Sequence, residues 1–263
     1  MSAYKIKHVI VMMYENRSFD SMLVFLYNND KHNKTPGAKV NVSPKGDAFE
    51  GLVGNESNPD LAGKEHTVFQ YQNTNKYSYY MPGKDPGEGF ANTNLQLFGA
   101  QEPPFDPGIK PNNGFLIDFE NGLQGNGVDN EPLENEEKKD QAPYAVPAPK
   151  DAKPAAYKWH KKSPEPNGLK NSGAFPGTVA SDIMGSYTPE MLPVLSGLAQ
   201  GYAVCDHWYC SVPSETLPNR AFTHMATSEG YLYDEKKSYG SPSIFAQLVA
   251  NNKTWGIFGN NGS

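Results

Sequence analysis

The amino-acid sequence predicts an α/β protein with a mostly parallel sheet and helices on both faces of that sheet. Three short apolar runs without polar alternation, at 6–14, 202–210 and 254–260, are typical of strands buried inside a parallel sheet. The first two runs are each followed by a turn and by a segment with helical spacing, so the order strand–turn–helix repeats. A chain of 263 residues is long enough for one large domain or two small ones.

The N-terminal stretch "HVIVMMYENRSFDSML" joins a strand pattern to a helix signal. Val, Ile and Met fill the run 6–14, which predicts a fully buried strand. The segment that follows predicts a turn into a helix, with Ser18 or Asp20 as the N-cap.

The middle of the chain, residues 29–180, is rich in Pro, Gly, Asn and Asp and has few long periodic segments. A short strand is expected at Val68–Tyr71, and short helices are expected at "FANTNLQLFGA" and "GFLIDFENGL". The stretch "NEPLENEEKKDQAPYAVPAPK" carries too much proline for either helix or strand. We expect so long an irregular span to form the rim or lid of a functional site.

Regular patterns return in residues 181–263. The stretch "YTPEMLPVLSGLAQGY" predicts a helix with Thr188 as its N-cap, Pro189 at its first position and Gly201 at its end. A second helix is expected after the turn "SVPSETLPNR", and a third is expected in "SPSIFAQLVANNK".

Composition and charge exclude some functions and leave others open. The formal net charge is -6 and no basic stripe recurs along the sequence, so a duplex nucleic-acid binder is not expected. The N-terminus "MSAYKIK" shows no signal peptide, and the apolar run 6–14 is too short to cross a bilayer. Localisation and oligomeric state stay open.

The two cysteines, Cys205 and Cys210, are expected to be free thiols. On one extended segment they lie roughly 16 Å apart, whereas a disulfide needs Cα atoms within roughly 7 Å of each other. Because they belong to the predicted strand 202–210, we expect both to be buried.

The turn "SVPSETLPNR" is one candidate site. With Thr216 as N-cap, its hydroxyl lies at a helix N-terminus, where backbone N–H groups and the helix dipole favour an anion. Arg220 and His224 follow at i+4 and i+8 and share a helix face with Thr216, drifting by about 40° per step. Together the three side chains predict a phosphate site. On spacing alone the stronger alternative is purely structural. Thr216 and the proline after it then form an ordinary helix start, and Arg220 pairs with a surface carboxylate.

Glu15 and Asn16, which follow the run 6–14, form the second candidate site. Such a pair is often only turn chemistry. Ligands of open α/β sheets, however, bind at the carboxyl ends of strands. Carboxylate and amide oxygens suit hard cations, and a metal-bound Thr hydroxyl becomes a useful nucleophile. The two strand ends together predict a metal-binding site, a nucleophile and a phosphate-binding side chain.

The stretches "IKHVIVMMYENRSFDSML" and "YAVCDHWYCSVPSETLPNRAFTHMATSEG" resemble the N-terminal signature and the nucleophile turn of one phosphoesterase family. That family includes bacterial and plant non-specific phospholipase C and a secreted acid phosphatase. "FEGLVGNESNPD", "NLQLFG" and "YTPEMLPVL" are also similar, so the resemblance covers almost the whole chain. It implies an alkaline-phosphatase-like three-layer α/β/α sandwich, as a single domain over 1–263. Residues 29–180 would be its rim, and 181–263 would carry the nucleophile turn.

The resemblance also implies roles for individual residues. Glu15 and Asn16 would bind a divalent metal ion, with Mg, Ca and Zn as candidates. Thr216 would be the metal-bound nucleophile, and Arg220 would support it and the phosphate. Asn219 is a weaker candidate for phosphate contact.

Two departures from the family pattern stand out, and His224 rests on the helix-face pattern more than on the family. Many members carry a His in a D-P-x-H segment, whereas "DPGEGF" has Glu88 there, as a substitute ligand or acid or with the role dropped. After Thr216 the chain offers one Asp, Asp234, where the family places several further Asp and His ligands. The chain therefore resembles the N-terminal part of a longer enzyme, and an incomplete domain is expected.

The expected function is a metal-dependent phosphoric ester hydrolase of the phospholipase C or acid phosphatase type, acting through a phosphothreonine intermediate. A phospholipid is one candidate substrate, and peripheral membrane contact stays open. Tyr77, Tyr79 and Tyr80 either meet a lipid surface or lie in the core. One alternative is a catalytically incomplete fragment or pseudoenzyme that binds phosphate, metal or a partner. Another is a sulfatase-like hydrolase, because "TLPNR" is similar to the sulfatase pattern, although an unmodified Thr216 argues against it.

Overall fold

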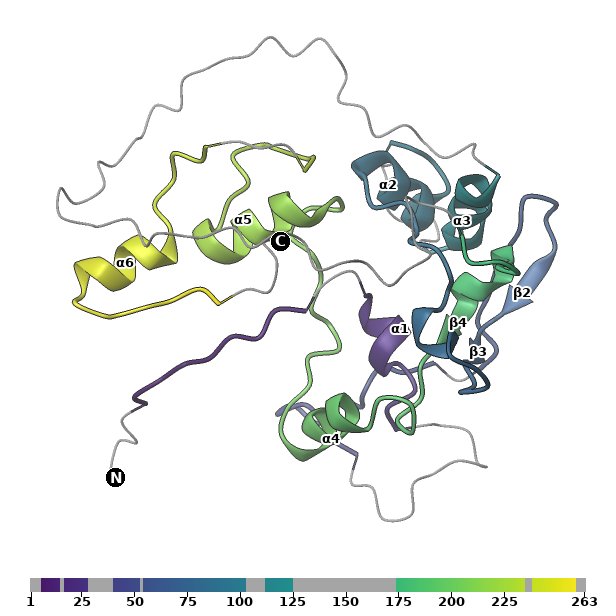
Figure 1. Ribbon diagram of the computed structural model, residues 1–263, viewed down its shortest axis with the longest axis horizontal. Helices are drawn as coiled ribbons and strands as arrows, with labels where there is room; N and C mark the ends of the chain where they lie inside the picture. The colour runs from purple at the N-terminus through teal and green to yellow at the C-terminus, as the bar shows by residue number, and fades with distance from the viewer. Residues whose placement is uncertain are drawn as a thin grey trace, which may run out of the picture. The chain divides into compact units, whose positions relative to one another are not determined.

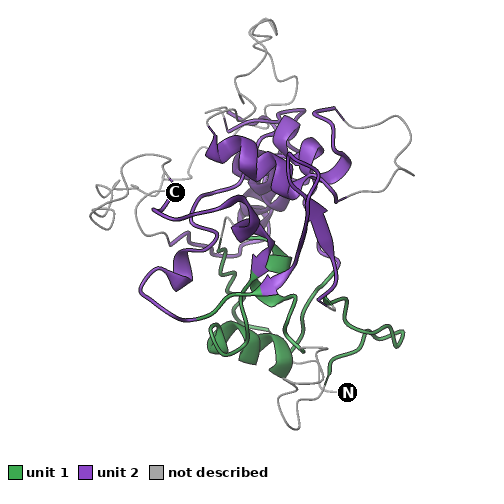
Figure 2. Cartoon of the chain, turned by 90° about the vertical axis from the view of Figure 1, so that its right-hand side faces the viewer, with its two compact units in different colours: residues 1–53, 70–72, 186–206 green, residues 54–69, 73–185, 207–263 purple. Residues whose placement is uncertain are grey.

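The computed structural model describes residues 6–14, 17–27, 40–52, 54–102, 112–124, 174–234 and 238–258. The chain divides into two compact units, which Figure 2 colours separately. Unit 1 comprises residues 1–53, 70–72 and 186–206, and unit 2 comprises residues 54–69, 73–185 and 207–263.

The described part of the chain contains short helices and short strands (Figure 1). In chain order the elements are α1 (Phe19–Leu23), β1 (Ser57–Pro59), β2 (Glu65–Thr67), β3 (Phe69–Gln70), the 3₁₀ helix η1 (Ser78–Tyr80), α2 (Phe90–Phe98), α3 (Phe115–Leu123), the 3₁₀ helix η2 (Ala180–Met184), β4 (Gly185–Ser186), α4 (Pro193–Gly201), α5 (Thr216–Met225) and α6 (Ile244–Ala250). This mixture of helix and sheet is consistent with the α/β class.

The described strands form two small sheets. β1 and β2 are antiparallel, with Asn58 opposite His66, and β3 pairs with β4. Strand β3 lies inside the stretch Val68–Tyr71 where a short strand was expected, so that prediction is confirmed.

The three longer predicted strands are wrong. Residues 6–14, 202–210 and the described part of 254–260 belong to no strand. Their large side chains are exposed, to 85% at Ile10, 81% at Trp208 and 96% at Phe258. A parallel strand needs partners from distant parts of the sequence, and in the described residues these runs have no ladder partner. Cys205 and Cys210 are free, as predicted, but exposed rather than buried, because their segment is not a strand in a sheet.

Helices with local signals form where they were expected. α2 and α3 confirm the two short helices of the middle segment. Ser18 caps α1, since its Oγ accepts from Ser21 N at 3.0 Å, and Ser243 caps α6 by accepting from Ala246 N at 3.3 Å. Polar caps of this kind satisfy N–H groups that have no partner inside the helix.

Helix α4 begins later than predicted. Thr188 is not its N-cap, because α4 begins at Pro193 after Leu192, whose φ is -120° and ψ is 57°. The proline ring disfavours helical geometry in the residue before it, so the helix starts at the second proline rather than at Pro189. Gly201 is the last residue of α4, as predicted.

Unit 2 contains a close pair of helices, α2 and α3, which lie side by side (Figure 1). Leu116 and Phe119 of α3 are 0% and 1% exposed. Gly114 precedes α3, and a Cβ at this position would lie 1.9 Å from the carbonyl oxygen of Leu95. The approach of the two segments therefore requires glycine at position 114.

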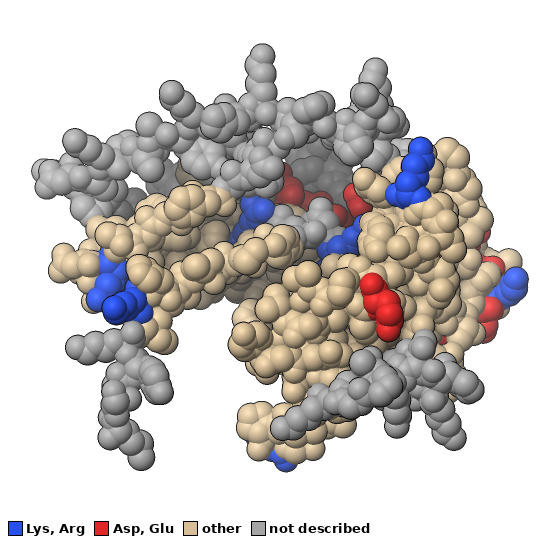
Figure 3. All heavy atoms as spheres, turned by 60° about the horizontal axis from the view of Figure 1, so that its bottom comes forward, with Lys and Arg blue, Asp and Glu red and all other residues tan. Residues whose placement is uncertain are grey.

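The surface carries charges of both signs. On the face shown in Figure 3, Lys or Arg and Asp or Glu side chains form small separate groups among uncharged residues. No helix in the described part of the chain is long and apolar enough to cross a membrane.

Candidate functional site

The candidate site is built on the turn that leads into α5, in unit 2. Thr216 is the first helical residue and Glu215 precedes it as the N-cap, one position earlier than predicted. Pro218 lies buried in the first turn, as predicted, where its missing N–H does no harm. Thr216 is partly buried, so its hydroxyl lies at a helix N-terminus that is still reached by solvent.

The side chain of Asn219 fastens this turn. Its Oδ1 accepts from Ser211 N at 3.0 Å and from Val212 N at 3.1 Å. Its Nδ2 donates to the carbonyl oxygens of Val212, Ser214 and Glu215 at 3.0, 3.1 and 2.9 Å. These backbone contacts use both donors and the acceptor of the amide. The Asn219 side chain therefore holds the turn before Thr216 through its backbone groups, and the phosphate contact that the family resemblance implied for Asn219 stays a prediction.

Asp234 reaches the same helix end from the loop after α5. Its Oδ1 accepts from Leu217 N at 2.6 Å, and its own N–H donates to Glu215 Oε2. Burial raises the pKa of the Glu215 carboxyl above its ordinary value, and the charge of Asp234 raises it further against the lowering effect of the hydrogen bond from Asp234 N. Two carboxylates thus flank the first turn of α5.

Arg220 and His224 lie further along α5. The pKa of His224 is lowered, first by burial and second by the positive charge of Arg220, so its neutral form is favoured. The His224 ring contacts the Phe245 ring of α6 at a centroid distance of 5.1 Å. Eight residues of helix separate Thr216 from His224, a rise of about 12 Å. Arg220 lies one turn from Thr216 and His224 lies two turns from it, and the predicted phosphate site of the three side chains stays a prediction.

The remaining predicted residues lie elsewhere in the chain. Glu88 is partly buried in the turn before α2, where its carbonyl oxygen accepts from Thr93 Oγ1 at 3.3 Å. Glu15 and Asn16 lie outside the described residues, so their predicted approach to Thr216 stays a prediction.

Tyr77, Tyr79 and Tyr80 are half-exposed, at 45%, 46% and 42%, which excludes the core alternative for them. The rings of Tyr77 and Tyr80 contact Phe175 at 5.3 and 5.4 Å between centroids. They form an aromatic surface cluster on and beside η1.

Sequence reasoning missed the parts that Glu215 and Asp234 play in the turn. Asp234 was recognised as an isolated carboxylate, but it lies 17 residues from its hydrogen-bond partner Leu217, and no periodic pattern connects the two. The one available signal was the composition of the turn, in which "SET" precedes Pro218 and resembles helix-start chemistry.

Comparison with known proteins places the chain in a family. The chain is similar to three proteins of Arabidopsis thaliana. Non-specific phospholipase C1 is 27% identical over 96% of this chain and 34% of the relative. Non-specific phospholipase C3 is 26% identical over 98% and 37%, and non-specific phospholipase C4 is 32% identical over 45% and 26%. The chain spans about a third of the length of the curated relatives that it matches along its whole length.

A family model covers almost the whole chain. The model of the Phosphoesterase family matches residues 6–263, a range that includes the N-terminal run, the rim segment and the turn before α5. The chain therefore belongs to the Phosphoesterase family.

Proposed function

We propose that this chain supplies the nucleophile turn of a metal-dependent phosphoric ester hydrolase of the phospholipase C or acid phosphatase type. The observation that carries the proposal is the position of Thr216 as the first residue of α5. The turn before it is held by Asn219, whose Nδ2 donates to three carbonyl oxygens of that turn. Family membership supports the same class of reaction, and the names of the relatives suggest a phospholipid as the phosphate ester. For the fold we propose the three-layer α/β/α sandwich that the family resemblance implies.

In the proposed reaction, Thr216 Oγ attacks phosphorus in line with the leaving oxygen. The new Oγ–P bond forms as the bond from phosphorus to the leaving oxygen breaks. Thr216 gives up its hydroxyl proton, and the leaving alkoxide takes up a proton. Water then attacks phosphorus, which releases phosphate or a phosphomonoester and restores the hydroxyl of Thr216.

The first turn of α5 limits how the phosphoryl group is bound. Leu217 N–H donates to Asp234, and Pro218 has no N–H to offer. Backbone donors at this helix end are therefore fewer than usual. In the proposal Arg220 supplies the main positive charge, since a guanidinium binds two phosphoryl oxygens at once.

The proposed metal site rests on oxygen donors. Glu15 offers a carboxylate, Asn16 an amide oxygen and Thr216 a hydroxyl, a set that fits a hard divalent cation. Such a cation, when bound, lowers the pKa of the Thr216 hydroxyl and offsets the negative charge of the transferred phosphoryl group. Glu88 remains a candidate additional ligand or acid.

A second candidate is a phosphate- or metal-binding chain without turnover. Binding of phosphate needs only the side chains of α5, Thr216 and Arg220 one turn further on, and among the described residues no group of three His, Cys, Asp or Glu side chains is arranged to hold a metal ion.

The test is hydrolysis of p-nitrophenyl phosphorylcholine and p-nitrophenyl phosphate with Mg²⁺, Ca²⁺ or Zn²⁺ added. Thr216→Ala is expected to lose roughly a thousandfold in kcat, because loss of a nucleophile removes the covalent route. Thr223→Ala is the matched control, an exposed threonine on the same helix, and is expected to keep full activity. Mass spectrometry of the acid-quenched wild type is expected to find phosphate on Thr216.

Absence of turnover with every metal would overturn the hydrolase for this chain. Binding of inorganic phosphate, followed by ³¹P NMR, then decides the second candidate. Phosphate binding that weakens in Arg220→Ala would support a binding chain, and absence of binding would exclude it.

A further inference from the structure

The aromatic surface cluster on and beside η1 has no part in the proposed reaction. Its three tyrosines, Tyr77, Tyr79 and Tyr80, are 45%, 46% and 42% exposed and lie within four consecutive residues of unit 2. Single exposed aromatic side chains are ordinary, but neighbouring ones that form a patch normally mark an interaction site. The cluster is therefore a candidate docking surface.

The backbone around Ser78 holds the tyrosines in place. Ser78 is 4% exposed, and its Oγ accepts from Thr74 N at 3.0 Å and from Asn75 N at 3.1 Å. The turn is closed by Tyr80 N, which donates to the Tyr77 carbonyl oxygen at 2.9 Å. Because hydrogen-bonded backbone presents the rings, docking on a partner costs little ordering of the chain.

Phe175 supports two of the rings from a segment far along the chain. Its N–H donates to the Gly83 carbonyl oxygen at 2.8 Å, and its ring contacts the rings of Tyr77 and Tyr80. The ring planes are tilted against Phe175 by 47° and 57°. This packing contributes to the buried part of each tyrosine, and the remaining part faces solvent.

Lys76 adds a positive charge to the cluster. It is exposed, and its Nζ lies 4.8 Å from the centroid of the Tyr77 ring, which is a cation–π contact. The surface thus combines apolar rings, phenol hydroxyls and an ammonium group. Lysine is depleted at protein–protein interfaces, whereas tyrosine is enriched where apolar lipid chains meet wet headgroups. The composition of the cluster therefore favours a lipid surface over a protein partner.

The charge of the chain selects the kind of lipid. The formal net charge is -6, so a strongly anionic bilayer repels the chain as a whole, and one lysine offsets only about 1 kcal/mol of that repulsion. A zwitterionic headgroup carries no net charge. Its phosphate attracts the ammonium group of Lys76, and its quaternary ammonium is attracted to the faces of aromatic rings.

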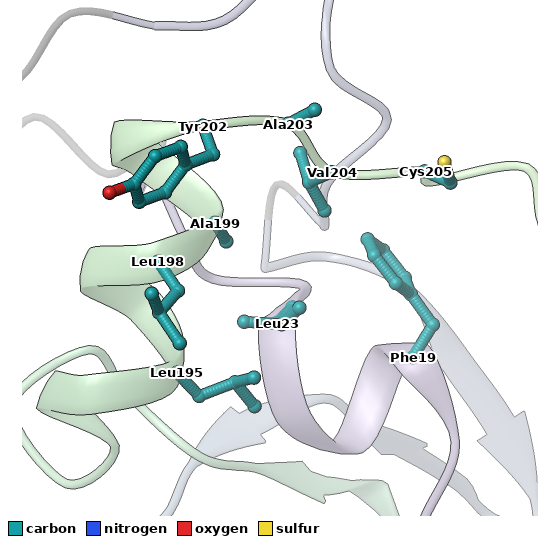
Figure 4. A pocket seen from close by; sticks show the side chains of 9 residues that line it. All are labelled: Phe19, Leu23, Leu195, Leu198, Ala199, Tyr202, Ala203, Val204 and Cys205. Atoms are coloured by element: carbon teal, nitrogen blue, oxygen red, sulfur yellow. The ribbon is translucent and has the colours of Figure 1, made fainter. Parts of the chain in front are cut away.

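A second apolar surface lies in unit 1 and differs in kind. It is a pocket of about 380 Å³, lined by side chains of α1, α4 and the segment 202–205 (Figure 4). Among the described residues that line it, polar side-chain atoms belong to Tyr202 and Cys205, and none of these residues is a Lys, Arg, Asp or Glu. The lining does not indicate the chemistry of a partner, so the pocket serves as a control surface.

We propose that the aromatic surface cluster docks the chain on a zwitterionic phospholipid bilayer. The tyrosine rings lie at the level of the ester groups, and Lys76 lies at the phosphates. Docking extends the proposed function, since a phospholipid substrate resides in such a surface. It does not require turnover at Thr216, so the two proposals are tested separately.

Sedimentation of the full chain with sucrose-loaded phosphatidylcholine vesicles measures docking. The triple variant Tyr77→Ala, Tyr79→Ala, Tyr80→Ala is expected to bind at least roughly tenfold more weakly, because three inserted rings are lost. The single change Tyr79→Asp is expected to weaken binding to a similar extent, because it places a charge among the lipid ester groups. Circular dichroism shows whether each variant is folded, and Tyr79→Asp decides the question if the triple variant is not.

Tyr202→Ala is the matched control, because Tyr202 is an 81% exposed tyrosine that lines the pocket of unit 1. It is expected to bind vesicles as the wild type does. Absence of binding by the wild type overturns the proposal, and so does equal binding by the wild type and the cluster variants. A loss in Tyr202→Ala alone assigns docking to the pocket. Stronger binding to phosphatidylserine vesicles that salt abolishes overturns the zwitterionic surface.

Two further measurements separate docking from the proposed reaction. Thr216→Ala is expected to bind phosphatidylcholine vesicles as the wild type does. The triple tyrosine variant is expected to hydrolyse soluble p-nitrophenyl phosphorylcholine at the wild-type rate, because that substrate presents no bilayer. Vesicle binding without turnover would contradict the proposed function and leave docking intact, and turnover without vesicle binding would do the reverse.

Discussion

The N-terminal run and the α2–α3 pair invert the usual relation between polarity and burial. Val9 to Met13 are apolar and exposed, whereas Asp118 of α3 is charged and only 2% exposed. Asp118 is buried because α2 supplies its partners: Asn92 Nδ2 donates to Oδ1 at 2.8 Å and Gln96 Nε2 donates to Oδ2 at 2.6 Å. The run is exposed because no neighbouring strand accompanies it among the described residues. Available partners, more than hydropathy, decide what is buried.

The largest expected effect is at the buried carboxylate. Asp118→Ala leaves Asn92 Nδ2 buried without its acceptor, and it leaves Gln96 Nε2 with the Gly87 carbonyl oxygen alone. This is expected to lower the free energy of unfolding by about 3 kcal/mol. Urea denaturation followed by circular dichroism measures it. Glu120→Ala is the control on the same helix, where an exposed hydrogen bond to Leu61 N is lost, with an expected cost of about 0.5 kcal/mol. Equal effects of the two changes would show that the buried network adds nothing.

A comparison of two apolar truncations sharpens the contrast. Leu116→Ala, at a fully buried position of α3, is expected to cost about 3 kcal/mol in the free energy of unfolding. Val11→Ala is expected to cost less than about 0.5 kcal/mol, because Val11 is 75% exposed. The same urea experiment measures both. A cost of about 1 kcal/mol or more for Val11→Ala would mean that the run is buried in solution.

The smallest effect concerns His224. Its pKa in the folded chain lies below the ordinary value of about 6.5, by burial and then by the charge of Arg220. The folded state therefore binds fewer protons than the unfolded state once the pH falls below about 6.5, and stability is lost from there down to the lowered pKa. His224→Gln is expected to remove this part of the pH dependence. Urea midpoints at pH 7.5 and 5.5 in both proteins test it, and an unchanged difference between the two pH values would assign the effect to other groups.

Helices were predicted better than strands, and particular residues show why. Ser18, one of two expected N-caps, identified the start of α1, and Gly201 identified the end of α4, since capping groups lie within a few residues of the backbone they satisfy. The strand at 6–14 was not found because a strand forms only when a second segment offers hydrogen bonds to it. The start of α4 was predicted at Pro189, but the helix begins at Pro193, because either proline can stand at the first position of a helix.

The arrangement of the candidate site was predicted only in part, and its chemistry stays a prediction. Thr216 at the start of α5 followed from the turn sequence alone. Two other features did not follow from the turn sequence: the hydrogen bonds of Asn219 to backbone groups and the hydrogen bond from Leu217 N to Asp234. Both depend on how the neighbouring loops fold back onto the start of α5. The meeting of Glu15 and Asn16 with Thr216 remains a prediction for the same reason.

The sequence by itself determined the N-cap of α1, the end of α4, the helix that follows the turn "SVPSETLPNR" and the membership of the Phosphoesterase family. These features rest on hydrogen bonds within four residues and on side-chain types in a fixed order. Tertiary structure alone decided that Asp118 is buried, that Asp234 lies at the start of α5 and that Val9 to Met13 face solvent. Each of these depends on partners far away in the chain, and the free energy of such contacts is set by what surrounds a residue rather than by the residue itself.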